Sequence, residues 1–89
     1  MDISYIQSSD GTKLRIGKSG DGDKHVLLIH GLAEHMGRYA HVVDALNEKG
    51  WAVTAVELRG HGKSDGKRGH VRKWDDYLED ARAAAKTID

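Results

Sequence analysis

Residues 26–35 of this chain read Val-Leu-Leu-Ile-His-Gly-Leu-Ala-Glu-His, and this stretch decides the fold. Its four consecutive apolar residues predict a strand, Val26–Ile29, covered on both faces as strands of parallel sheets are. The strand runs into His-Gly, a turn that leaves backbone amides free. Free amides at such a turn are typical donors of an oxyanion hole, so the end of this strand is the first candidate site.

A hairpin is predicted before this strand and a helix after it. Two short segments of alternating polarity, Ile3–Gln7 and Thr12–Ile16, are joined by an Asp-Gly turn signal and predict two antiparallel strands. The glycine-rich residues 17–24 predict a loop. Beyond the His-Gly turn, apolar residues recur at helical spacing, and Gly50 then suits a helix C-cap. These apolar residues are Tyr39, Val42, Val43 and Leu46.

The second half of the chain repeats the order of strand and helix. Trp51–Leu58 predicts a second buried strand, residues 60–69 predict a loop, and a last helix is expected from about Trp74. The acids of this helix, from Asp75 to Asp80, are predicted to form a solvated face. Its buried face is predicted to carry Trp74, Leu78, Ala81, Ala85 and Ile88. Strands that alternate with helices indicate the α/β class with a parallel pair of strands, in a single domain over residues 1–89.

The composition excludes several classes of function. The 89 residues carry 14 basic and 14 acidic side chains, so no excess positive charge is present to attract nucleic acid. There is no cysteine, which excludes a disulfide framework and a thiolate nucleophile. No apolar run reaches the roughly 20 residues of a membrane span, and no charged leader opens the chain, so a cytoplasmic location is expected.

Two motifs of this chain resemble those of a known family. Residues 30–39 read His-Gly-Leu-Ala-Glu-His-Met-Gly-Arg-Tyr, and residues 59–71 read Arg-Gly-His-Gly-Lys-Ser-Asp-Gly-Lys-Arg-Gly-His-Val. Both closely resemble the monoacylglycerol lipase and lysophospholipase branch of the α/β-hydrolase fold. The resemblance covers essentially the whole chain, but only about the first third of a family member. It implies a truncated α/β-hydrolase half, an N-terminal hairpin plus a parallel βαβα unit, that ends before the nucleophile elbow.

The resemblance also implies roles for residues of the first motif. The amide of Leu32 would help to form the oxyanion hole, and Glu34 and Arg38 would line the polar end of a glycerol pocket. The catalytic serine, acid and histidine of the family would all lie beyond this chain. Two positions depart from the family pattern: Met36 stands where serine or a small residue is usual, and Glu57 stands where aspartate is usual.

Histidines and a carboxylate are predicted to gather at one edge of the sheet. His30 and Glu57 end the two parallel strands, and open α/β sheets bind ligands at the edge where such strands end. Together with His35, His61 and His70 they form a candidate site for a divalent transition metal, zinc or manganese. The alternative is that most of these histidines only hydrogen-bond loop backbone, as the resemblance implies.

A fold that stops at this point is expected to self-associate. In the family, the strand Val26–Ile29 also pairs with the strand that carries the nucleophile, so one of its edges would have unpaired N–H and C=O groups here. Such an edge is a template for pairing with another copy, and helices would expose the faces that the missing half covers. We expect a homo-oligomer, a dimer or a tetramer, formed through this edge.

Three functions fit these features. The favoured one is a metal-dependent hydrolase of ester or phosphodiester bonds in a small-molecule substrate, with the His/Glu metal site formed in the oligomer. There Arg38 or Arg59 would steady a developing anion, unless Arg59 is tied to a local carboxylate. The second is an inert fragment, or an N-terminal half that works only beside the missing C-terminal half. The third is a binding module that uses Glu34 and Arg38 without chemistry.

Overall fold

The computed structural model describes residues 1–30 and 35–88. Their elements, in chain order, are β1 (Asp2–Gln7), β2 (Lys13–Ser19), β3 (Lys24–Ile29), the short 3-10 helix η1 (Met36–Tyr39), α1 (Ala40–Glu48), β4 (Trp51–Val56) and α2 (Trp74–Ala85). This order confirms the predicted α/β class. No helix of the described residues is long and apolar enough to cross a bilayer.

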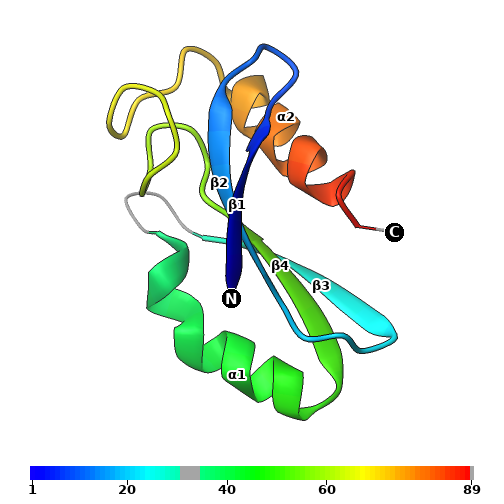
Figure 1. The fold of residues 1–89 in the computed structure, drawn as a ribbon. Coiled ribbons are helices and arrows are strands. Elements are labelled where there is room, and N and C mark those ends of the chain that lie inside the picture. The colour runs from blue at the N-terminus through cyan, green and yellow to red at the C-terminus, as the bar shows by residue number, and fades with distance from the viewer. Residues whose placement is uncertain (31–34, 89) are drawn as a thin grey trace.

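A single mixed sheet holds these elements together, with the strand order β1-β2-β4-β3. β2 pairs antiparallel with β1 and with β4, whereas β3 pairs parallel with β4, Ile29 lying opposite Val56. β2 runs to Ser19, beyond its predicted end, because its last residues pair with β4. The parallel pair brings the ends of β3 and β4 to one edge of the sheet, as predicted, and the site is built there (Figure 1).

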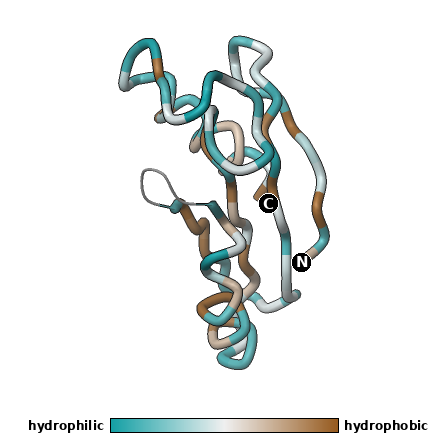
Figure 2. Tube along the Cα trace, turned by 90° about the vertical axis from the view of Figure 1, so that its left-hand side faces the viewer, coloured by the Kyte–Doolittle hydropathy of each residue, from teal (hydrophilic) through white to brown (hydrophobic). Residues whose placement is uncertain are grey.

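Two glycines hold the tight turns that the sequence indicated. Gly11 closes the β1–β2 hairpin with φ +87°, and the amide of Ser8 donates to the carbonyl of Thr12 across 2.8 Å. Gly50 follows α1 with φ +86°, in the left-handed region that favours glycine after a helix. The trace of the strand that begins at the N-terminus shows two hydrophobic stretches with a paler stretch between them (Figure 2).

The two helices cover the sheet from either side (Figure 1). α2 packs on the sheet face that carries Leu14, Ile16 and Val56, and its own Ala84 joins them in a buried cluster. α1 contacts β4 and directs Val43, which is 3% exposed, into the interior. Residues of a strand alternate between the two faces, so both sides of β4 are buried from Ala52 to Val56. β4 is therefore the most enclosed strand of the described chain.

β3 is less enclosed than predicted. Val26, Leu27 and Leu28 are only half-buried and Ile29 is 44% exposed, whereas the sequence predicted a strand covered on both faces. The reason is topological. β3 is the last strand of the sheet in the described residues, so β4 is its only neighbour.

The predicted orientation of α2 is wrong. Trp74 is 68% exposed and Leu78 is 49% exposed, whereas the side chains that α2 buries are those of Asp76, Tyr77, Asp80 and Ala84. The acids were predicted to be solvated, but two of them face inward because a buried arginine, Arg59, lies beneath them. This orientation of α2 goes together with the pairing of Asp76 and Asp80 with Arg59, which the spacing of apolar residues in the sequence does not reveal.

Candidate functional site

A buried histidine follows the end of β3. His30 is 5% exposed, and its Nε2 atom accepts a hydrogen bond of 3.0 Å from the backbone amide of Leu58. An N–H group can only donate, so Nε2 of His30 carries no proton in this contact. The contact ties the end of β3 to the end of β4. It therefore fixes the point from which residues 31–34 depart.

His61 lies beside His30, with 4.9 Å between the ring centroids. Its Nδ1 atom is 3.0 Å from the carbonyl oxygen of Arg59, which makes Nδ1 the donor of that contact. Its Nε2 atom is buried, and no described residue offers it a hydrogen bond. The structure thus brings His30 and His61 together as predicted. Each ring, however, bonds to loop backbone, as the alternative interpretation held.

Glu57 follows β4 and is fully buried. Its carboxylate accepts two hydrogen bonds from Arg15 of β2, from Nε to Oε1 at 2.7 Å and from Nη2 to Oε2 at 2.9 Å. The amide of Lys63 donates to Oε1 at 2.9 Å, and the amide of Met36 donates to Oε2 at 3.3 Å. The two positions that depart from the family pattern, Met36 and Glu57, are therefore in direct contact.

These contacts keep Glu57 ionised. Burial by itself raises the pKa of Glu57, but the hydrogen bonds from Arg15 and from the amides of Lys63 and Met36 outweigh it, so the pKa lies below its ordinary value. The bond to Glu57 in turn raises the pKa of Arg15. The loop also fits closely around the carboxylate, because a Cβ atom at Gly62 would overlap it.

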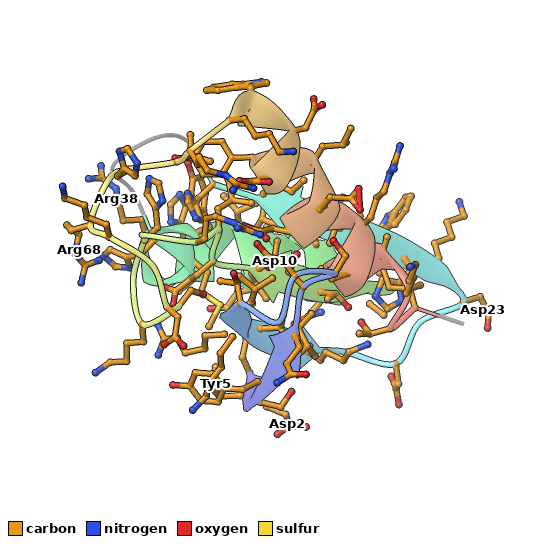
Figure 3. The ribbon with its side chains drawn as sticks, turned by 90° about the horizontal axis from the view of Figure 1, so that it is seen from above. Asp2, Tyr5, Asp10, Asp23, Arg38 and Arg68 are labelled. Atoms are coloured by element: carbon orange, nitrogen blue, oxygen red, sulfur yellow. The ribbon has the colours of Figure 1, made fainter. Side chains whose placement is uncertain are left out.

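A pocket of about 600 Å³ opens between the 60–69 loop and the start of η1. His35, Glu57 and His61, three of the predicted metal ligands, line it together with Arg15, Lys63 and Arg68. His70 is exposed and Arg38 lies just past His35, its amide donating to the carbonyl of His35 at 3.2 Å. Figure 3 shows Arg38 and Arg68 at the same end of the molecule. Leu32 and Glu34, predicted for the oxyanion hole and the glycerol pocket, lie outside the described residues.

The described contacts do not support the predicted metal site. Within residues 1–30 and 35–88, no three His, Asp or Glu side chains are grouped so as to hold a metal ion. The physical reason lies in the ligands themselves: both oxygens of Glu57 face Arg15, and Nε2 of His30 already serves the amide of Leu58. A metal would have to displace these partners.

Arg59 does not face the site either. Its guanidinium is tied to three carboxylates: Asp80 at 2.7 Å, Asp10 at 2.7 Å and Asp76 at 3.8 Å. The hydrogen bond to Asp80 is the main cause that raises the pKa of Arg59, and Arg59 holds the pKa of Asp10 well below its usual range. Asp10 lies close to α2 when the molecule is seen from above (Figure 3). Arg59 therefore joins the hairpin turn to α2, and the prediction that it steadies a reacting anion is not supported.

The sequence does contain the pattern of a nucleophile elbow, Gly-x-Ser-x-Gly, at residues 62–66. The prediction that the chain ends before the elbow overlooked this match. An elbow serine stands on a sharp turn between a strand and a helix. Ser64 instead lies within the loop between β4 and α2. Its hydroxyl donates to the carbonyl of Glu57 and accepts a hydrogen bond of 2.8 Å from the amide of Arg15. Ser64 thus has a structural role, joining the loop to β2.

Comparison with known proteins gives a family and several relatives. A family model described as serine aminopeptidase, S33, matches residues 20–89. Monoacylglycerol lipase of Mycolicibacterium smegmatis is 49% identical over 64% of this chain, and phospholipase YtpA of Bacillus subtilis is 31% identical over 72% of it. Monoglyceride lipase of Rattus norvegicus is 29% identical over 98% of the chain. The chain spans 20%, 26% and 30% of the lengths of these three relatives.

Solved structures of esterases have the same fold over nearly the whole chain. The Pyrococcus furiosus esterase Pf2001 superposes with a TM-score of 0.83 at 28% identity, covering 98% of this chain and 35% of the esterase. An esterase of Exiguobacterium antarcticum also gives a TM-score of 0.83, at 25% identity, covering 96% of this chain and 31% of its own. The predicted resemblance and the predicted fold class are both confirmed.

Proposed function

The chain belongs to the hydrolase family described as serine aminopeptidase, S33, and on this premise we propose that it forms the N-terminal part of a serine hydrolase that cleaves carboxylic esters. Relatives named as lipases and structural neighbours named as esterases support ester substrates. In this proposal the chain supplies the backbone amide of Leu32 to the oxyanion, and a further part of the polypeptide supplies the nucleophile and its base.

One structural observation carries the proposal. In the sequence, the segment that contains Leu32 lies between two residues with buried hydrogen bonds, which we call anchors. His30 accepts a hydrogen bond from the amide of Leu58, and the amide of Met36 donates a hydrogen bond to Glu57. Both anchors are buried, and both connect to the residues that follow β4. Donors that stabilise an oxyanion have to be held in place before the reaction, because a donor that must reorganise loses much of its benefit. The described residues on either side of this segment, His30 and Met36, are each held by such a buried contact.

The test is to restore a complete hydrolase around this chain. Residues 1–89 would replace the matching N-terminal segment of the Mycolicibacterium smegmatis monoacylglycerol lipase, and hydrolysis of p-nitrophenyl butyrate and of a monoacylglycerol would be measured. We expect the joined protein to hydrolyse both esters and the isolated chain to hydrolyse neither. A folded but inactive joined protein, beside an active parent lipase, would refute the proposal.

The Gly-x-Ser-x-Gly match at residues 62–66 also needs a control in the joined protein. Ser64→Ala removes the hydroxyl of the loop Gly-x-Ser-x-Gly match, and we expect the joined protein to keep its activity in this variant. The reason is that this hydroxyl is committed to Glu57 and Arg15. Loss of activity in a folded Ser64→Ala variant would instead point to Ser64 as a nucleophile.

The self-association of the chain and its cytoplasmic location remain predictions, separate from the proposed function. Ile29, Trp74 and Leu78 are exposed apolar residues, and a homo-oligomer formed through the β3 edge would shield part of them. Light scattering on the isolated chain decides the point: a dimer or tetramer mass supports the oligomer, and a monomer mass refutes it. The cytoplasmic location is tested by fractionating cells that express the chain.

A further inference from the structure

The side of α2 that apolar periodicity predicts to be buried lies on the outside of the molecule. Trp74, Leu78 and Ala85 are exposed, and Ala81 is half-buried. We call these four residues the α2 seam. The strands that α2 contacts, β1, β3 and β4, belong to the sheet on which its other side packs (Figure 1). The seam is therefore an apolar helix face that the described chain leaves uncovered.

The α2 seam has the spacing of a surface that pairs with another helix. Its four residues follow one another at intervals of four, three and four positions, which are the intervals between the a and d positions of a heptad repeat. At 3.6 residues per turn, residues spaced in this way lie along one side of a helix. Trp74 and Leu78 provide apolar area, and the small side chains of Ala81 and Ala85 allow a second helix to approach closely.

Arg59 keeps the seam on the outside. Its guanidinium lies beneath α2 and pairs with the buried carboxylates of Asp80 at 2.7 Å and Asp76 at 3.8 Å. Turning α2 to bury the seam would separate these charges, and breaking a buried ion pair is strongly destabilising. Within one copy of the chain the seam thus cannot turn inward, so covering it requires a partner.

A row of charges beside the seam indicates which partner fits. Asp75 and Glu79 occupy the N-terminal half of this row, and Arg82 and Lys86 occupy its C-terminal half. Glu79 and Arg82 pair with each other at 3.0 Å, whereas Asp75 and Lys86 are exposed and have no ion pair among the described residues. A second α2 lying antiparallel would bring the acidic half of each row to the basic half of the other. A parallel neighbour would bring like charges together.

We infer that the α2 seam is the contact surface of a homodimer in which two α2 helices pair antiparallel about a twofold axis. Trp74 then packs beside the partner's Ala85, and Leu78 packs beside the partner's Ala81, so each large side chain meets a small one. At each end of the contact, Asp75 lies beside the partner's Lys86. This surface is separate from the free edge of β3, and the inference does not rest on the proposed ester hydrolysis.

Sedimentation equilibrium of the 89-residue chain tests the contact surface. We expect a reversible dimer, and Trp74→Ala should weaken it at least about 100-fold, because each dimer loses two indoles from its interface. Ile29→Lys places a charge at the free edge of β3 and should leave the dimer intact. Far-UV circular dichroism checks that each variant is folded, and the exposure of Trp74 and Ile29 makes both changes tolerable in the monomer.

Three results would overturn the inference. The first is a monomer at every concentration, which would leave the seam to another occupant, such as a further part of the polypeptide. The second is a dimer that survives Trp74→Ala unchanged. The third is a dimer that Ile29→Lys abolishes, which would place the interface at the edge of β3.

Charge reversal tests the antiparallel pairing. Asp75→Lys and Lys86→Asp should each weaken the dimer at least about fivefold, because each turns two attractive contacts into two repulsive ones. The double variant should recover most of the affinity, since the same pairs form with their signs exchanged. Asp44→Lys reverses an exposed acid of α1 and should change the affinity less than about twofold. A double variant that is as weak as either single variant would overturn the antiparallel pairing.

Discussion

Removing the carboxylate of Asp80 is expected to cost more stability than removing any exposed acid of this chain. Asp80 is fully buried in α2, and its oxygens accept hydrogen bonds from the backbone amide of Arg59 at 2.9 Å and from the guanidinium at 2.7 Å. Breaking a buried ion pair by removing one partner costs about 3–5 kcal/mol. Arg59 would keep Asp10 at 2.7 Å and Asp76 at 3.8 Å, so the low end of that range, about 3 kcal/mol, is expected for Asp80→Ala.

Urea unfolding measures this cost. For a slope of about 1.5 kcal/mol per molar urea, a loss of 3 kcal/mol lowers the midpoint by about 2 M. Two matched variants set the scale. Glu79→Ala removes the neighbouring acid, which pairs with Arg82 on the surface of the helix, and should cost less than about 0.5 kcal/mol. Asp10→Ala removes a half-exposed partner of the same arginine, and added salt should weaken its effect but not that of Asp80→Ala.

A cost below about 1 kcal/mol for Asp80→Ala would refute the reasoning. So would equal costs for Asp80→Ala and Glu79→Ala. Either result would mean that Arg59 repacks toward its remaining carboxylates, and that burial of Asp80 contributes nothing beyond a surface pair. A midpoint shift close to 2 M would establish the Arg59–Asp80 pair as the main link between α2 and the end of β4.

Three further outcomes are expected. The pKa of Glu57 lies below its ordinary value of 4.5, so the stability that its ionised form contributes should be complete at neutral pH and be lost as pH falls below 4.5. Urea unfolding midpoints measured from pH 7 to pH 3 should show this loss, and the loss should be smaller in Glu57→Gln. Gly62→Ala should cost at least about 1 kcal/mol more than Gly50→Ala, since both have positive φ but only at position 62 would a Cβ overlap a side chain, and unfolding midpoints compare them directly. Elemental analysis of the purified chain should find zinc and manganese well below one per chain, because the oxygens of Glu57 are taken by Arg15, and a stoichiometric metal would restore the metal-dependent hydrolase as the leading function.

Local signals in the sequence predicted much of the fold correctly. The Asp-Gly turn, the glycine after α1 and the alternation of strands with helices are each read within a few residues, and the structure confirms them. The parallel pairing of β3 with β4 also follows, because a helix between two strands returns the chain to the same direction. These features depend on backbone conformation and side-chain period, which a short stretch of sequence determines.

The orientation of α2 could not be predicted in this way. Its apolar residues Trp74 and Leu78 recur at helical spacing, and periodicity alone places them inside. The structure exposes both and buries Asp76 and Asp80, since Arg59 provides a buried positive charge for these acids to meet. A pairing of residues 21 positions apart leaves no local pattern in the sequence.

By itself, the sequence determined the family, because the motifs at residues 30–39 and 59–71 are long enough to be specific. It also placed both motifs after parallel strands, as the structure shows. Only the tertiary structure decided which partners the residues of the candidate site contact. Glu57 was predicted as a metal ligand, and the structure shows its carboxylate in contact with Arg15, 42 residues away in the chain. The same carboxylate oxygens can bind a metal cation or accept hydrogen bonds from a backbone amide or an arginine. Its partners are therefore set by which donors the fold brings within hydrogen-bond distance, and for Glu57 these include the guanidinium of Arg15 on β2 and the backbone amide of Met36.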